Sequence, residues 1–156
     1  MKIIILGAGQ VGASVAEGLV SEENDITVVD YDGQRLAQLQ DRLDLRTVTG
    51  NAATPSVLRN AGAADADMVI AVTQSDHANL VACKLAHSVF NVPTRIARLR
   101  SQDFLDDSNL LSIDNFAVDF ALCPEQVITD YIRNLVEFPE ALQVLSFAHG
   151  RVSLVA

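Results

Sequence analysis

Short apolar runs alternate with amphipathic stretches along most of this chain. The runs at 3–6 and 67–72 are unbroken, which is typical of parallel strands covered on both faces. Between the runs, apolar residues recur at helical spacing, as Val11, Val15 and Leu19 do. The pattern predicts strands at 1–6, 25–30, 45–49, 67–72, 93–99 and 116–121. It predicts helices from residue 10 onward and at 32–41, 56–61, 75–90 and 102–109.

This order of strands and helices corresponds to two βαβαβ halves. It predicts an α/β fold with a doubly wound parallel sheet of the Rossmann type. Thr54 and Pro55 are expected to provide the N-cap and the first residue of the helix near 56–61. Ser75 is expected to cap the helix that follows the fourth strand.

The last 33 residues depart from this alternation. Pro124 is expected to begin a helix that Pro139 ends. Its apolar residues form a stripe wider than one sheet edge needs: Val127, Ile128, Tyr131, Ile132, Leu135 and Val136. Strands at 144–148 and 151–155, with His149-Gly150 at the turn, predict a short β-hairpin. We therefore expect a principal domain at 1–122, a crossover and dimerisation helix at 123–139, and the truncated start of a following lobe at 140–156.

The first strand runs directly into Gly7-Ala-Gly9-Gln-Val-Gly12, which fits the pattern G-x-G-x-x-G. Gly7 would allow a tight turn, Gly9 would let the backbone approach a pyrophosphate, and Gly12 would let the helix pack closely on the strand. The phosphates would lie on unpaired N–H groups at the start of the helix, where the helix dipole favours negative charge. The predicted phosphate loop comprises Gly7, Gly9, Gln10, Val11 and Gly12.

The second strand ends in an acid, Asp30, which lies 18 residues beyond Gly12. An acidic side chain at this distance accepts hydrogen bonds from a ribose 2′-hydroxyl and would repel a 2′-phosphate. The expected ligand is NAD(H) rather than NADP(H), with ADP or ATP as the alternative, because the same pocket would hold adenine, ribose and phosphates. We expect Asp30 to face solvent and to contribute little to stability.

Composition limits what the chain can bind. With 156 residues, 49% of them hydrophobic, it can bury the core of one principal domain. Its net charge of −9 disfavours nucleic acid, because non-specific binding to nucleic acid depends on neutralising phosphates. No apolar window approaches the roughly 20 residues that a membrane-spanning helix needs. Cys83 and Cys123 have no metal or C-x-x-C spacing and are expected to be small core residues in a reducing cytosol.

Residues with catalytic side chains are present but are not arranged for catalysis. Ser75-Asp76-His77 cannot form a catalytic triad, because successive helical residues point about 100° apart. Tyr31 and Tyr131 lack the lysine that a short-chain dehydrogenase places four residues later. We therefore predict no catalytic residue, no metal site and no enzymatic activity. The alternative is the N-terminal cofactor domain of an NAD-dependent dehydrogenase that lacks its catalytic domain.

Further polar residues follow the fourth and fifth predicted strands. Thr73, Asp76 and Asn79 are expected beside the cleft at the carboxyl end of the sheet, where ligands bind in such folds. Arg95, Arg98 and Arg100 are concentrated along the fifth strand and its end. They form either a solvated strand end or, for Arg98 and Arg100, which share a face, a group that reaches phosphates.

Five segments together resemble the RCK, or KTN, family of regulatory domains: 1–12, 25–30, 61–68, 71–76 and 95–100. The resemblance continues through the helix that begins at Pro124 and into 142–147, so it covers essentially the whole chain. It implies a cytoplasmic regulatory domain, peripheral to the inner face of the cell membrane, that binds NAD(H) or ADP/ATP. It also implies homo-oligomeric rings of dimers and the gating of a membrane potassium channel subunit of the TrkH type.

The resemblance implies roles for further residues of this sequence. Asn51 and Ala52 would edge the adenine. Thr73, Asp76 and Asn79 would line the second half of the site, and Arg98 and Arg100 would approach phosphates. His77 departs from the family pattern, which usually has an acid after the aspartate of this motif. This departure puts in doubt any charge-based sensing at position 77.

Overall fold

Two compact units make up the chain, Met1–Leu122 and Cys123–Ala156. The computed structural model describes residues 1–21, 23–107, 109–137, 144–147 and 152–155. All of the predicted nucleotide-site residues fall within the first unit.

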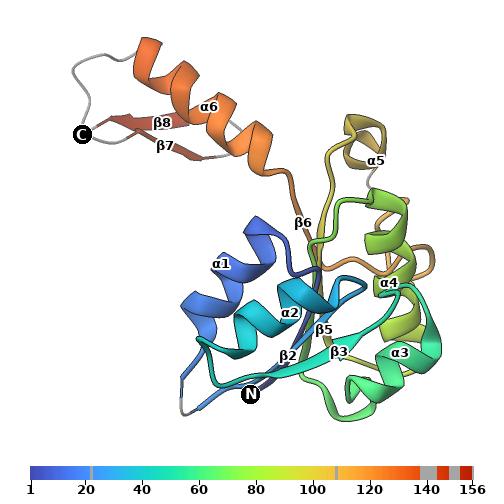
Figure 1. Ribbon diagram of the computed structural model, residues 1–156. Helices are drawn as coiled ribbons and strands as arrows, with labels where there is room; N and C mark the ends of the chain where they lie inside the picture. Colours follow the sequence, from blue (N-terminus) through green and yellow to red (C-terminus); the bar gives the residue numbers. More distant parts are fainter. Residues whose placement is uncertain (22, 108, 138–143, 148–151, 156) are drawn as a thin grey trace. The chain divides into compact units, whose positions relative to one another are not determined.

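The first unit is built on a six-stranded sheet in which every neighbouring pair is parallel (Figure 1). Its strands are β1 (Lys2–Leu6), β2 (Asp25–Asp30), β3 (Arg46–Thr49), β4 (Met68–Ala71), β5 (Thr94–Arg98) and β6 (Phe120–Leu122). The order β3-β2-β1-β4-β5-β6 confirms the predicted doubly wound parallel sheet. Leu6 of β1 pairs with Val29 of β2 and Ala71 of β4, so these three strands end together. We call this side of the sheet the carboxyl edge.

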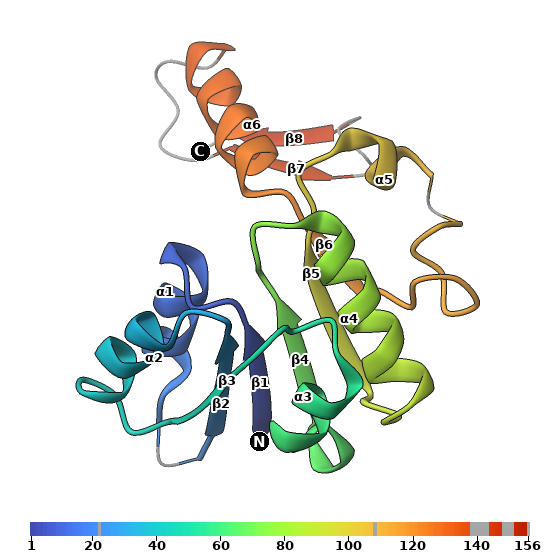
Figure 2. The ribbon, with the colours of Figure 1, turned by 45° about the vertical axis from the view of Figure 1, so that its right-hand side comes forward.

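Helices cover both faces of the sheet (Figure 2). α1 (Gln10–Leu19) and α2 (Gly33–Gln40) lie on one face, and α3 (Pro55–Asn60) and α4 (Asp76–Ser88) lie on the other. A 3-10 turn, Ala63–Asp65, follows α3, and α5 (Gln102–Asp106) follows β5. None of the helices described here combines the length and the apolar character needed to cross a membrane.

Two of the predicted helix starts are confirmed. Ser75 caps α4, and its hydroxyl accepts a hydrogen bond from the Ala78 N–H at 3.2 Å. Thr54 occupies the N-cap position of α3 and Pro55 its first position. Both helices therefore begin at the carboxyl edge, as a parallel sheet with helical crossovers requires.

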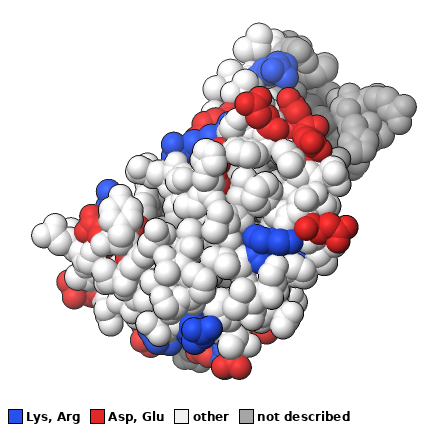
Figure 3. Space-filling view, turned by 90° about the vertical axis from the view of Figure 1, so that its right-hand side faces the viewer, with Lys and Arg blue, Asp and Glu red and all other residues white. Residues whose placement is uncertain are grey.

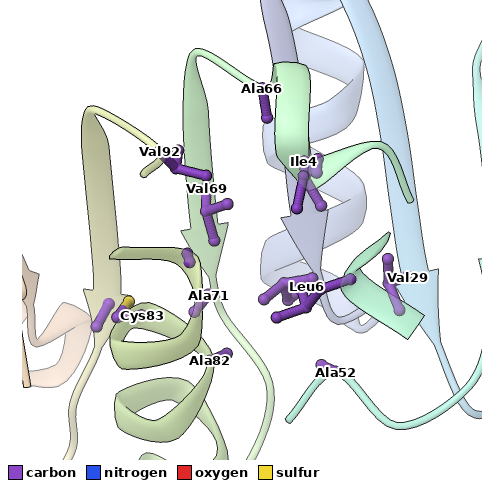
Figure 4. Close-up of a cluster of buried hydrophobic side chains, with 14 of the residues drawn as sticks. Ile4, Leu6, Val29, Ala52, Ala66, Val69, Ala71, Ala82, Cys83 and Val92 are labelled. Atoms are coloured by element: carbon purple, nitrogen blue, oxygen red, sulfur yellow. The ribbon is translucent and has the colours of Figure 1, made fainter. Parts of the chain in front are cut away.

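A hydrophobic cluster fills each face of the sheet. On one face, Leu6 belongs to the same cluster as Leu58 of α3 and Cys83 of α4. Figure 4 shows Leu6 and Cys83 within this cluster. On the other face, Ile5 belongs to the same cluster as Leu36 of α2. Successive residues of a strand point to opposite faces, and here both faces are covered. This double coverage is the reason for the unbroken apolar runs in the sequence.

The sixth strand begins later than the predicted range 116–121, at Phe120. Arg95 is only 4% exposed, and its guanidinium donates hydrogen bonds at 2.7 Å to the Ala117 carbonyl and to the Asp119 carboxylate. These bonds hold the segment before the strand as a loop in which Ala117 has a φ of +55°. The prediction of a strand at 116–119 was wrong because a buried arginine from β5 fixes a different backbone path there.

Few Lys, Arg, Asp or Glu side chains lie on the face of the first unit that α3 and α4 cover (Figure 3). Val81 of α4 is 41% exposed, and Val89, directly after that helix, is 46% exposed. The acidic character of the chain is therefore not spread evenly over this unit.

The second unit contains α6 (Pro124–Glu137) and two antiparallel strands, β7 (Val144–Phe147) and β8 (Val152–Val155). Pro124 begins the helix, and the strands pair as the predicted hairpin. The predicted helix stop at Pro139 and the predicted turn at His149-Gly150 lie outside the described residues. Four apolar side chains of α6 are between 55% and 76% exposed: Ile128, Tyr131, Ile132 and Val136.

Candidate nucleotide-binding site

The loop between β1 and α1 uses three glycines for three different reasons. Gly7 has a φ of +110°, a backbone conformation in which a side chain would be strained. A Cβ on Gly12 would lie 1.8 Å from the Gly7 carbonyl oxygen, so only glycine lets α1 approach the loop this closely. A Cβ on Gly9 would meet no heavy atom of the described residues within 4 Å. The Gly9 backbone therefore borders open space, as close approach of a pyrophosphate requires.

The start of α1 faces this open space with backbone donors. Gly9 is the N-cap residue, and because glycine has no side chain it cannot itself cap the N–H groups of the first turn. Gln10 is exposed and Val11 is half-buried, and neither carries a charge. The N–H groups and the positive end of the helix dipole are thus suited to bind an anionic group such as a phosphate.

Asp30 is buried, which corrects the expectation that it faces solvent. The residue is only 7% exposed. Its Oδ2 accepts a hydrogen bond from the Ala8 N–H at 2.6 Å, and its Oδ1 accepts one from the Asp32 N–H at 2.8 Å. A carboxylate has about four acceptor positions, so both oxygens retain capacity for ribose hydroxyls. The Gly-rich loop folds against the end of β2 and removes the carboxylate from bulk water.

The sequence patterns did not identify Ala8 and Asp32 as partners of this carboxylate. Ala8 carries no signal of its own, because its contribution is a backbone N–H whose position depends on the fold of the loop. Asp32 does carry a sequence signal, because an aspartate directly before a helix is a common N-cap residue. Its carboxylate accepts the N–H groups of Gln34 and Arg35 at 3.0 and 3.3 Å.

Three of the predicted site residues lie together where β4 leads into α4. Asn79 is 0% exposed, and its Oδ1 accepts a hydrogen bond from the Thr73 hydroxyl at 2.6 Å. Asp76 is half-buried, and its Oδ2 accepts the N–H groups of Arg100 and Ser101, each at 2.9 Å. Thr73 and Asp76 are partly accessible at the carboxyl edge, whereas Asn79 can act on a ligand only through the residues that it holds.

The three arginines of the β5 region have different locations. Arg98 is the last residue of β5 and is half-buried, while Arg100 follows it and is exposed. Both belong to the carboxyl edge, as the predicted approach to phosphates requires. Arg95 lies near the opposite end of the strand, where its buried guanidinium forms an ion pair with the partly exposed carboxylate of Asp119 at 2.7 Å. Its role is structural.

The loop after β3 lies beside Asp30, because the Gly50 N–H donates a hydrogen bond to the Asp30 carbonyl at 2.9 Å. Asn51 is exposed, and its Oδ1 accepts the Ala53 N–H at 2.9 Å, which closes the turn. Ala52 is 7% exposed and its methyl group belongs to the hydrophobic cluster around Leu6 (Figure 4). Ala52 therefore offers mainly its backbone to a ligand, whereas Asn51 also offers a side chain.

Two further features fall outside the predicted chemistry. His77 is exposed in the first turn of α4, and its ring packs edge-on against Phe104 of α5 with 5.7 Å between the ring centroids. A groove of about 740 Å³ lies at the opposite edge of the sheet, beside the first residues of three strands, Lys2, Asp25 and Arg46. None of the predicted site residues lines this groove.

The sequence and the fold of this chain resemble those of known proteins. Residues 3–118 match the TrkA-N domain. The chain belongs to the TrkA-N domain family. Proteins named Trk system potassium uptake protein TrkA from Halomonas elongata and Vibrio alginolyticus are 56% and 53% identical to it over 100% of this chain. The chain spans 34% of each of these relatives, about a third of their length.

Solved structures share the TrkA-N fold. The TrkA-N domain of the inner membrane protein ybaL from Escherichia coli aligns over 86% of this chain and 96% of that one, with a TM-score of 0.74 at 21% identity. The Shewanella denitrificans Kef CTD in its AMP-bound form aligns over 88% and 81%, with a TM-score of 0.66 at 20% identity. The GsuK channel bound to NAD aligns over 84% and 23%, with a TM-score of 0.70 at 19% identity.

Proposed function

We propose that this TrkA-N domain binds an adenine nucleotide at the carboxyl edge of its sheet. The observation that carries the proposal is the open space beside the Gly9 backbone, next to the N–H groups and positive dipole of α1. The Asp30 carboxylate contacts the same loop through the Ala8 N–H. NAD(H) is the expected ligand, with ADP or ATP as the alternative. The AMP-bound Kef and NAD-bound GsuK structures support a nucleotide on this fold.

In this proposal the two halves of the site have separate tasks. The phosphates bind to the loop of Gly7, Gly9, Gln10, Val11 and Gly12. The carboxylate of Asp30 accepts hydrogen bonds from ribose hydroxyls, and Asn51 with the Ala52 backbone edges the adenine. The second half uses Thr73 and Asp76, with Asn79 behind them, and the guanidinium groups of Arg98 and Arg100 approach phosphates.

The domain acts as a regulator and not as an enzyme. Relatives that match the whole chain are named as potassium uptake proteins of Trk systems, and the chain spans about a third of their length. In the whole protein, nucleotide occupancy would be passed to a membrane potassium channel subunit of the TrkH type. That partner would hold an otherwise cytoplasmic protein at the inner face of the membrane.

Assembly with further copies of the chain is part of the proposal. The exposed apolar side chains of α6, Ile128, Tyr131, Ile132 and Val136, are the kind of surface that a partner normally buries. A second copy of the helix would supply a matching surface through two-fold symmetry. We infer a dimer through this crossover helix, as one step in the assembly of a ring.

Calorimetric titration of the chain with NADH, NAD, ADP and ATP tests the binding proposal. Saturable binding of at least one of them, at a single nucleotide per chain, is the expected result. Absence of saturable heat with all four nucleotides would overturn it.

The regulatory proposal needs the full-length protein with its channel subunit. Potassium flux into vesicles that contain both proteins should depend on the added nucleotide. Flux that is the same with and without every nucleotide, in a protein that binds them, would refute gating while leaving the binding site intact.

A further inference from the structure

The side-chain amide of Asn79 is engaged on both of its polar atoms by residues at two strand ends. Its Oδ1 accepts the Thr73 N–H at 3.0 Å and the Thr73 hydroxyl at 2.6 Å. Its Nδ2 donates to the Thr73 carbonyl at 3.3 Å and to the Arg98 carbonyl at 2.8 Å. An amide side chain can accept two and donate two hydrogen bonds, so its capacity is used in full.

These bonds join the ends of β4 and β5 through the first turns of α4. Thr73 lies just beyond the end of β4, and Arg98 is the last residue of β5. Asp76, three positions before Asn79, continues the same connection by accepting the N–H groups of Arg100 and Ser101. We call Asp76 and Asn79 the α4 clasp. The clasp fixes the backbone that carries Thr73, Arg98 and Arg100.

The clasp and the Gly-rich loop lie on opposite sides of the point where the strand order reverses. In the order β3-β2-β1-β4-β5-β6, this point lies between β1 and β4. A doubly wound sheet binds a dinucleotide across that point, one mononucleotide on each half. Asp30, at the end of β2, belongs to the first half, and the α4 clasp, between β4 and β5, belongs to the second.

We propose that Asn79 is a positioning residue for the second half of the dinucleotide site, and that it sets the preference for NAD over AMP. It does so by holding Thr73 and the Arg98 carbonyl in place without touching the ligand, because it is completely buried. AMP ends at its first phosphate and can occupy only the first half, so its affinity does not depend on the clasp. This inference rests on the proposed function.

A merely structural asparagine would behave differently. Replacing a buried amide leaves its partners without hydrogen bonds and lowers stability whatever the site binds. A general loss of stability reduces the folded fraction of the chain. It therefore lowers the apparent affinity for every ligand by the same factor. The ratio of the affinities for NAD and AMP therefore separates positioning from stability.

The test is calorimetric titration of the wild-type chain and of Asn79→Ala with NAD and with AMP. We expect the affinity for NAD to fall about tenfold, equivalent to about 1.4 kcal/mol, and the affinity for AMP to change less than about twofold. Asp119→Ala is the matched control, because it removes a polar tie from the other end of β5. That variant should leave the ratio of the two affinities unchanged.

A second variant and a measurement on the wild type cover the case in which Asn79→Ala does not fold. Asn79→Asp keeps the volume and the acceptor for Thr73 but cannot donate to the Arg98 carbonyl when ionised, and it should lower the NAD to AMP ratio in the same direction. In the wild type, NAD and not AMP should increase the protection of the Thr73, Arg100 and Ser101 amides from hydrogen exchange.

Equal losses of affinity for NAD and for AMP, in whichever variant folds, would overturn the positioning role of Asn79. Equal protection of the amides from hydrogen exchange by the two ligands would overturn it as well. In both cases the wild type still binds nucleotide, so the proposed function stands. A wild-type chain that binds neither NAD nor AMP would instead refute nucleotide binding itself, and the inference with it.

Discussion

The carboxylate of Asp30 accepts the N–H of Ala8 at 2.6 Å, so the end of β2 holds the Gly-rich loop that follows β1. The residue proposed to bind ribose is therefore also part of the framework of the phosphate loop. Its second oxygen holds the Asp32 N–H, at the point where the chain turns toward α2. Loss of this side chain should affect both stability and binding.

Asp30→Ala should lower the free energy of unfolding by about 1–3 kcal/mol, because a buried N–H at Ala8 would lose its acceptor. It should also weaken the binding of NAD(H) or ADP by about 1–3 kcal/mol, because the hydrogen bonds to the ribose are lost. Urea denaturation and calorimetry measure the two effects. Asp41→Ala, which removes an exposed acid, is the control. Unchanged stability would disprove the framework role, and unchanged affinity the ribose role.

Asp119→Ala should destabilise the fold without changing nucleotide affinity in the folded chain. The change leaves the guanidinium of Arg95, whose side chain is 5% exposed, without its carboxylate partner. Because the Asp119 side chain is 33% exposed, water can replace part of the interaction, and we expect a loss of about 2 kcal/mol. A variant as stable as the wild type in urea would show that the ion pair does not stabilise the segment that leads into β6.

Cys83 is buried, whereas Cys123 is partly exposed, which corrects the expectation that both are core residues. The two thiols should therefore differ in reactivity. Burial raises the pKa of the Cys83 thiol to about 12, so the nucleophilic thiolate is scarce there in the folded chain. Because the folded state favours the neutral thiol, this group contributes stability below pH 9.0 that is lost as the pH rises toward about 12. Titration with a disulfide reagent at pH 8 should find one rapidly reacting thiol, Cys123, and a second only in denaturant. Rapid labelling of Cys83 in the folded chain would contradict its burial.

Ile128→Asp combined with Ile132→Asp should weaken dimerisation and leave the first unit folded. Both side chains are more than half exposed on α6, and burying carboxylates between two copies is unfavourable. In the full-length protein the double variant should also uncouple nucleotide from potassium flux. Sedimentation of the variant and the wild type measures the first effect. A dimer of unaltered strength would mean that these side chains pack within their own chain.

The fold was predictable because the sequence is locally consistent. The unbroken runs in β1 and β4, and capping residues such as Ser75, indicate a parallel sheet without any knowledge of its contacts. The start of β6 was not predictable in this way. It depends on the buried side chain of Arg95, which donates a hydrogen bond to the carbonyl of Ala117, 22 positions later in the sequence. Long-range hydrogen bonds of this kind leave no local periodicity.

The candidate site was predictable to the extent that it is backbone chemistry. The glycine spacing predicted the turn at Gly7 and the close helix packing at Gly12, and the distance from Gly12 predicted Asp30 as the ribose-binding acid. Burial was the property that the spacing could not provide, because the loop that covers Asp30 follows a different strand. Asn79 was likewise predicted to line the site from its position in the sequence. That position could not show that the hydrogen bonds of its amide are all made inside the protein.

If a nucleotide binds to the bare backbone of the Gly-rich loop, Gly9→Val should prevent binding without unfolding the chain. Gly9 has a φ of −72°, and its Cβ position is open, so valine fits the fold but occupies the space needed by a pyrophosphate. We expect that NADH binding measured by calorimetry is abolished while the far-UV circular dichroism is unchanged. Gly12→Val, whose Cβ would collide with the Gly7 carbonyl, should instead disturb folding. Wild-type affinity for NADH in a folded Gly9→Val chain would show that the nucleotide binds elsewhere and not on this loop.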